Sequence, residues 1–298
     1  MMRRPEALAS RICVTRCDPF ANIAITFYKT EIQVADTINT IVLGVIEGIT
    51  EFLPISSTGH LLIAEQWLGA RSELFNVAIQ AGAILAIVLI YWRRLVALLT
   101  RFDQADNRDY LVKLIVAFLI TAVGGLAATK MGFKLPEKVL PIAVAELVGG
   151  ILILLIEAYV ANKPKIATVT WNVAIWVGLC QILAGVFPGT SRSAATIFAA
   201  MLAGLTLRPA ATEFAFLVGI PTMFAATGYE FLKARGAGEG PEDWNALAVG
   251  FVVSGIVAFI AVKWLLRYVQ SHRFTVFAWY RILLGAALLA LAAAGIVS

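Results

Sequence analysis

The chain has 298 residues, of which 60% are hydrophobic and only 14% are charged. A soluble domain of this length does not need so apolar a composition, so the sequence indicates a protein embedded in a lipid bilayer. The formal net charge of +5 is small and spread along the chain. It relates to orientation in the membrane and gives no reason to expect a nucleic-acid partner.

Residues 1–37 are predicted to form an N-terminal tail, to which we assign no role. Arg and Lys residues interrupt this stretch, and its longest apolar run, 20–27, is too short for a membrane span, which needs about 20 residues. The remaining residues, 38–298, are predicted to form a single membrane domain.

Residues 38–69 form an apolar segment that is long enough to cross a bilayer, but Pro54 interrupts it. A proline inside a helix breaks it, so two half-helices that meet inside the membrane fit better than one span. We therefore predict a re-entrant hairpin. Two carboxylates, two hydroxyls and an imidazole gather around its tip: Glu47, Glu51, Ser56, Ser57 and His60.

The spacing of these polar residues suggests a phosphate site. Glu47 and Glu51 lie four residues apart and so share one face of a helix. Ser56 and Ser57 follow the proline, where the N-cap of a new helix belongs, and Gly59 allows close backbone approach. The free N–H groups and the positive dipole end of such a helix attract anions.

Beyond the first hairpin the chain shows two sets of three spans, separated by a second polar segment that a proline interrupts. The first three spans are predicted at about 74–92, 111–129 and 139–160. The second interrupted segment runs over 172–204, and spans follow at about 212–232, 246–268 and 277–297.

The second half of the chain repeats the first. Residues 44–60 can be laid on 178–194 without a gap, which pairs Glu47 with Gln181, Pro54 with Pro188 and Ser57 with Ser191. Each half, 38–160 and 172–298, then holds one hairpin and three spans. An odd number of spans places the halves in opposite orientations, with the two hairpin tips facing each other. The predicted fold is an all-α polytopic membrane protein, an inverted-topology repeat with two re-entrant hairpins and about six transmembrane helices.

Arg192 in the second hairpin follows a serine at an expected helix start, deep in an apolar segment. An unpaired guanidinium there would cost about 2.5–3.5 kcal/mol or more, so it needs an anion. We expect Arg192 and a divalent cation on Glu47 and Glu51 to balance the carboxylates, with a phosphate group between them. Oxygen donors alone suit Mg²⁺ or Ca²⁺ better than zinc.

The two motifs EGITEFLPISSTGH (47–60) and PGTSRSAAT (188–196) resemble the signatures of the undecaprenyl-diphosphate phosphatases of the bacitracin-resistance type. The resemblance covers nearly all of 38–298. It implies hydrolysis of undecaprenyl diphosphate to undecaprenyl phosphate and phosphate, which recycles the lipid carrier for cell-wall synthesis and gives bacitracin resistance. The implied setting is the bacterial cytoplasmic (inner) membrane, with a polyprenyl diphosphate as substrate and membrane lipids around it; the oligomeric state stays open.

The motif positions carry the implied roles. We expect Ser57, His60, Glu51 and Glu47 to be the catalytic residues, and the two glutamates to be those that hold the cation argued for above. The phosphate-binding residues are Arg192, Ser56, Ser191, Ser193, Gly189 and Thr196. Simpler interpretations stay open: the serines could only cap helices, and Arg192 could only balance a glutamate.

Two routes for the reaction stay open at this stage. Ser57 could attack the terminal phosphorus, with His60, three residues on, as the proton-transfer group. Alternatively, Ser57 could be a ligand while His60 or Glu51 activates water. A transporter or flippase of a polyprenyl phosphate is the rival function, because inverted repeats with broken helices are common in transporters. The histidine and paired serines favour the enzyme, since anion transport needs donors and no nucleophile.

The distribution of Lys and Arg predicts the orientation. Loops around 93–113, 163–165 and 263–281 carry the charges that favour the cytoplasm. This arrangement places the mouth of the first hairpin on the periplasmic or outer side.

Overall fold

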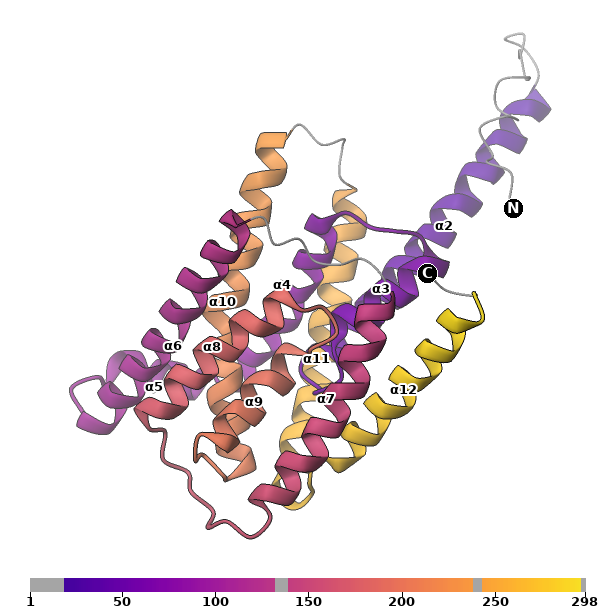
Figure 1. Cartoon of the computed structure of the whole chain (residues 1–298). Coiled ribbons are helices and arrows are strands. Elements are labelled where there is room, and N and C mark those ends of the chain that lie inside the picture. The colour runs from indigo at the N-terminus through magenta and orange to yellow at the C-terminus, as the bar shows by residue number, and fades with distance from the viewer. Residues whose placement is uncertain (1–18, 132–138, 238–242, 296–298) are drawn as a thin grey trace.

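The computed structural model describes residues 19–131, 139–237 and 243–295, and within these ranges every regular element is a helix (Figure 1). The first half holds α2 (Pro19–Thr50), α3 (Ser57–Leu68), α4 (Glu73–Ile90), α5 (Trp92–Thr100), α6 (Ala105–Lys130) and α7 (Val139–Val160). The second half holds α8 (Trp171–Val186), α9 (Arg192–Leu202), α10 (Arg208–Ala237), α11 (Trp244–Ser271) and α12 (Thr275–Ala293).

Six of the described helices, α4, α6, α7, α10, α11 and α12, are long and apolar enough to cross a membrane. A helix satisfies its backbone hydrogen bonds internally, which is what a segment in hydrocarbon requires. The prediction of an all-α polytopic membrane protein with about six spans is therefore confirmed. The two predicted hairpins are also present, as α2 with α3 and α8 with α9, whose members pack against each other.

The structure differs from the predicted boundaries at two places. α2 begins at Pro19 and runs without a break to Thr50, so part of the predicted tail is helical, and this end of α2 extends beyond the other helices (Figure 1). Residues 1–18 lie outside the described residues. The stretch 93–113, predicted as a loop, holds most of α5 and the start of α6, where buried Lys113 donates to the carbonyl of Val169 at 2.7 Å.

The helices α7 and α12 pack side by side and run in opposite directions (Figure 1). A Cβ on Gly150 would lie 2.6 Å from the carbonyl oxygen of Ala278, and a Cβ on Gly285 would lie 2.7 Å from that of Ala143. Glycine is needed at both places because the backbones approach so closely. In one contact a glycine of α7 meets a carbonyl of α12, and in the other a glycine of α12 meets a carbonyl of α7. An inverted repeat requires this reciprocal relation. The inverted orientation of the complete halves stays a prediction.

Candidate active site

The two hairpin tips contact each other, although they lie far apart in the sequence. Residues 51–57 are all buried. Ser193 at the start of α9 donates its hydroxyl hydrogen to the carbonyl oxygen of Leu53 in the first tip, at 2.9 Å. The structure thus brings together the two motifs that the sequence placed at facing tips.

Each second half-helix begins with a serine cap. Ser56 Oγ accepts a hydrogen bond from the backbone N–H of Gly59 at 3.4 Å, and Ser191 Oγ accepts one from Ala194 at 3.3 Å. The two serines have φ values of 68° and 63°, a left-handed conformation that side chains rarely adopt. The same strained backbone therefore occurs at both tips, and a cap stabilises it.

The caps correct the predicted repeat register. Ser191 corresponds to Ser56, so Arg192 corresponds to Ser57, and the gapless pairing of Ser57 with Ser191 is wrong at the tips. The tips differ by one residue in length, and the two adjacent serines of the first motif hid this difference. The pairing of Glu47 with Gln181 before the tips agrees with the structure in one respect, because both side chains are buried.

We expect Ser191→Ala to lower the free energy of unfolding by about 1–2 kcal/mol, since alanine loses the cap and keeps the unfavourable φ. Ser191→Gly loses the same hydrogen bond but adopts positive φ at little cost, so it should be less destabilising. Thermal unfolding of both variants in one detergent measures the difference. Equal losses of stability would contradict a role for backbone strain at this tip.

The paired glutamates lie on the last turns of α2 and at the first tip. Ser57 Oγ donates a hydrogen bond to Glu51 Oε2. Glu47 has no exposed surface, and within the described residues neither of its carboxylate oxygens has a hydrogen-bond partner. A buried carboxylate without a partner is costly, so Glu47 requires a cation, a proton or an added ligand.

A narrow pocket lies between the tips. Its polar lining comes from Glu51, Gln181, Arg192, Ser193 and Thr196. Its apolar wall comes from Phe52 at the first tip, Ile84 on α4, and Ala215, Phe216, Gly219 and Met223 on α10. Ser57 is not part of the lining and reaches the pocket through Glu51. The arrangement presents a carboxylate, an amide, a guanidinium and two hydroxyls to one ligand.

Gln181 is a site residue that the sequence did not single out. It is 3% exposed, and both its amide atoms lack a hydrogen-bond partner within the described part of the chain. Its position opposite Glu47 in the repeat was the signal that could have identified it. The amide can donate to a phosphate oxygen or accept from a water molecule in the pocket.

Arg192 is the first residue of α9, and its side chain is half-buried in the pocket wall. Among the residues that the structure describes, no carboxylate forms an ion pair with its guanidinium. Arg192 is therefore not a direct ion-pair partner of Glu47 or Glu51 in this geometry. The guanidinium is left available for an anionic ligand.

The remaining predicted phosphate-binding residues divide into two groups. Ser193 and Thr196 line the pocket, but their hydroxyls already donate to backbone carbonyls, that of Thr196 to Arg192 at 2.8 Å. Ser56, Ser191 and Gly189 lie outside the lining. Gly189 has a φ of 84°, and its carbonyl accepts a hydrogen bond from Arg281.

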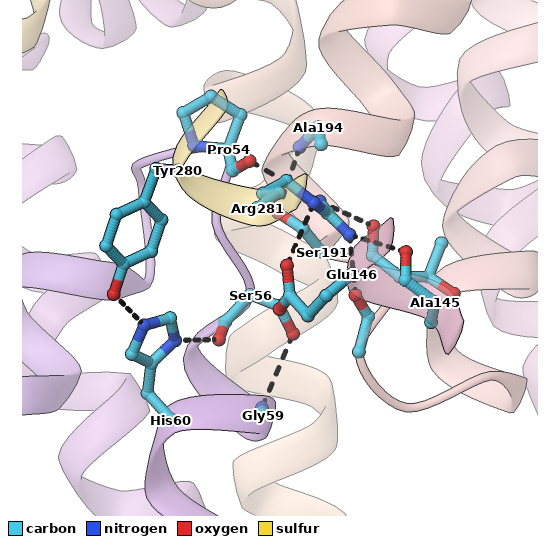
Figure 2. Close-up of polar contacts among 12 residues, drawn as sticks. Pro54, Ser56, Gly59, His60, Ala145, Glu146, Ser191, Ala194, Tyr280 and Arg281 are labelled. Atoms are coloured by element: carbon cyan, nitrogen blue, oxygen red, sulfur yellow. Dashed lines mark hydrogen bonds and ion pairs between the residues drawn. The ribbon is translucent and has the colours of Figure 1, made fainter. Parts of the chain in front are cut away.

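His60 lies on α3, and its ring points toward Tyr280 (Figure 2). Its Nδ1 lies 2.8 Å from the carbonyl oxygen of Ser56, and its Nε2 lies 2.6 Å from the hydroxyl of Tyr280 on α12. The ring also stacks on that of Tyr280. Both ring nitrogens are therefore engaged, and the structure does not bring His60 to Ser57 or Glu51. Its role in proton transfer stays a prediction.

Arg281 was assigned by sequence to a basic loop, and that assignment is wrong. It lies within α12, has no exposed surface and pairs with the equally buried Glu146 of α7 at 3.0 Å (Figure 2). The sequence could not show this, because the two Nη atoms donate to backbone carbonyls that only the fold brings near.

The donor set fits a cation that prefers oxygen, but incompletely. Within the described ranges, no three His, Cys, Asp or Glu side chains gather in a group that could hold a metal. Glu47 and Glu51 supply carboxylate oxygens, and the oxygen of Gln181 has no partner. A Mg²⁺ or Ca²⁺ ion could be held here with water or phosphate oxygens completing its coordination.

The described part of the chain has six membrane-length helices and two serine-capped tips. Between the tips, the carboxylate of Glu51 shares a pocket with a guanidinium that forms no ion pair with any described residue, so the fold and site are those of a polytopic membrane protein with a site suited to phosphate. Residues 40–287 match the family model described as Bacitracin resistance protein BacA. An undecaprenyl-diphosphatase of Rhizobium etli is 63% identical over 264 residues, covering 88% of this chain and 100% of the relative. An undecaprenyl-diphosphatase of Xanthomonas oryzae pv. oryzae is 59% identical over 256 residues, covering 86% and 97%. The chain belongs to the BacA family.

Proposed function

We propose that this protein is a membrane phosphatase that hydrolyses undecaprenyl diphosphate to undecaprenyl phosphate and inorganic phosphate. The observation that carries the proposal is the hydrogen bond from Ser57 to Glu51, because Glu51 shares its pocket with Arg192. A hydroxyl activated by a carboxylate, next to a free guanidinium, is suited to phosphoryl transfer. The names of the relatives support the choice of substrate. Recycling of the lipid carrier and bacitracin resistance follow from this activity.

The first chemical step is a displacement at the terminal phosphorus. Glu51 accepts the proton of Ser57, whose oxygen forms a bond to phosphorus, while the bond to the bridging oxygen breaks and undecaprenyl phosphate leaves. The guanidinium of Arg192 can form two parallel hydrogen bonds to the equatorial oxygens, where charge accumulates in the transition state. Water then cleaves the phosphoserine and releases phosphate. In this route the proton acceptor is Glu51, because the ring of His60 would first have to break its hydrogen bonds with Tyr280 and with the carbonyl of Ser56.

A divalent cation would be held by Glu47 and Glu51. When bound, it would neutralise part of the charge of the diphosphate. The chain itself contributes the orientation of Glu51 through Ser57, and it excludes bulk water from Glu47 through burial.

Phosphate release from a C55 diphosphate by the purified protein tests both the activity and the metal. We expect release to stop after exhaustive chelation and to return with Mg²⁺ or Ca²⁺, because the carboxylate of Glu47 has no hydrogen-bond partner among the described residues. Full activity after chelation would contradict the metal requirement but would still support the phosphatase activity. No release with any cation, together with movement of labelled polyprenyl phosphate across vesicle membranes, would favour the transporter.

The proposed location is the bacterial cytoplasmic membrane, with the pocket open toward the outer side. Exposed arginines on α5 and in the turn that follows it support a cytoplasmic position for that end of the helices. A cysteine in place of Arg101 should therefore be protected from an impermeant thiol reagent in intact cells and react after lysis. Labelling of intact cells at this position would reverse the orientation.

A further inference from the structure

Arg281 connects the two hairpin tips through its guanidinium. Nη1 donates to the carbonyl oxygens of Pro54 at 3.4 Å and Thr190 at 3.3 Å, and Nη2 donates to those of Gly189 at 2.8 Å and Ala145 at 3.0 Å (Figure 2). Pro54 belongs to the first tip, and Gly189 and Thr190 belong to the second. One fully buried side chain on α12 therefore holds both tips and α7 at once.

Glu146 supplies the opposite charge, and it also touches the first hairpin. Its Oε2 lies 3.0 Å from Nε of Arg281, and both side chains have no exposed surface. A Cβ on Gly59 would lie 3.3 Å from Glu146 Oε1, so the carboxylate packs against the first turn of α3. The pair is the kind of buried charge that becomes strongly destabilising when one partner is removed.

Gly149 on α7 provides the space for this guanidinium. A Cβ there would lie 2.4 Å from Nη2 of Arg281, closer than two such atoms can approach. The guanidinium is fully buried, bonded to four backbone carbonyls and paired with Glu146, so it cannot shift without losing some of these contacts. The surface of α7 thus leaves room for the guanidinium of Arg281, and a single methyl group at Gly149 would displace that guanidinium.

Apart from Arg281, the two tips share apolar packing, in which Phe52 and Leu53 belong to one cluster with Ala194, but few polar contacts that would fix their register. Within the described residues, the other polar contact between them is the single hydrogen bond from Ser193 to Leu53. The tips carry the groups that must act on one phosphate: Ser57 follows Pro54 closely, and Arg192 follows Thr190. A misplacement of about 1 Å between such groups can cost about 10²-fold in rate.

We propose that Arg281, with Glu146 as its partner, is a positioning residue that fixes Ser57 on one tip relative to Arg192 on the other. This inference rests on the proposed function. Neither Arg281 nor Glu146 lines the pocket, and the hydrogen bonds of Arg281 go to backbone carbonyls of the two tips and of α7. Their effect reaches the reaction through the backbone of the tips.

A purely structural role for the ion pair is the alternative, and α7 offers a matched control. Glu157 lies on the same helix, is equally buried and pairs with Arg208, but its contacts reach α10 and the backbone of Phe274 and not the tips. Glu157→Gln and Glu146→Gln are thus the same change at two buried ion pairs. For Gly149→Ala the control is Gly125→Ala on α6, where nothing lies within 4 Å of a new Cβ.

The kinetic experiment measures Tm, kcat and KM for undecaprenyl diphosphate in these four variants and in two replacements of Arg281. We expect Glu146→Gln and Gly149→Ala to lower kcat by about tenfold or more, with a smaller change in KM, because Arg192 still binds the ground state. Glu157→Gln should lower Tm with kcat retained, and Gly125→Ala should change neither. Arg281→Lys should recover only part of the activity lost in Arg281→Met, since an ammonium cannot reach all the acceptors of a guanidinium.

The spatial experiment does not depend on activity. Spin labels at Ile49 and Phe187, exposed positions next to the two tips, in a background without other cysteines, report the distance between the tips by pulsed EPR. We expect Glu146→Gln and Gly149→Ala to broaden or shift that distance, and Glu157→Gln to leave it unchanged. An unchanged distance in the first two variants, or wild-type kcat in both, would overturn the positioning role. Shifted tips in a protein that releases no phosphate would instead contradict the proposed function alone.

Discussion

Glu51→Gln should lower kcat for phosphate release about 10²–10⁴-fold, the usual contribution of a positioned general base. The glutamine keeps the shape of the side chain and can still bond to Ser57, but it cannot take the hydroxyl proton. The loss should therefore appear mainly in kcat, since the change leaves the proposed contacts of Arg192 and Gln181 to phosphate in place. Single-turnover rates with the C55 diphosphate measure it.

Glu65→Gln is the matched control for this prediction. Glu65 lies in the same hairpin, on α3, but outside the pocket lining, so its replacement should leave kcat unchanged. If Ser57 and Glu51 act as one unit, the double variant Glu51→Gln/Ser57→Ala should be no slower than Ser57→Ala alone. Losses that multiply would show that the two residues act separately.

The stereochemical outcome separates the two routes to phosphate release. Attack by Ser57 involves two displacements at phosphorus, so a chiral terminal thiophosphate should be released with retention. Direct attack by water is one displacement and gives inversion. Inversion would remove Ser57 as the nucleophile and leave the phosphatase assignment in place.

The spans and hairpins were predictable because they depend on local properties of the chain. An apolar run of membrane length predicts a span wherever it occurs, and Pro54 among polar residues predicts a break. The cap at Ser56 follows from the same local chemistry. The contact between Ser57 and Glu51 is also local, since the tip that separates them is only a few residues long.

Contacts between distant segments could not be predicted in this way. Arg281 follows a basic stretch in the sequence, and nothing nearby shows that Pro54 and Gly189 will offer it their carbonyl oxygens. Similarly, nothing in the sequence indicates that the hydroxyl of Tyr280 will lie within hydrogen-bonding distance of Nε2 of His60, the residue expected to act on Ser57. In both cases α12 supplies the partner, and its place beside the tips depends on the packing of α12 against α7.

Arg192 is the other residue whose replacement should have a very large effect. Its guanidinium lines the pocket with Glu51 and Gln181 and forms no ion pair with any described residue. A cation held in an apolar protein without a partner is unfavourable, so we expect the substrate phosphate to supply the missing anion. This gain is available only when phosphate is bound, and it grows as charge develops on the equatorial oxygens.

We expect Arg192→Lys to lower kcat/KM about 10²–10³-fold, although the charge is conserved. A guanidinium offers a planar pair of donors that matches two phosphate oxygens, whereas an ammonium acts as a single point of charge on a shorter reach. The same change at Arg208, which pairs with Glu157 outside the pocket, is the control and should retain kcat/KM while lowering stability. An Arg192→Lys enzyme close to wild type would mean that Arg192 only balances the charge of Glu47 and Glu51, and that another group binds the phosphate. Gln181, whose buried amide has no partner, would then be the first residue to test.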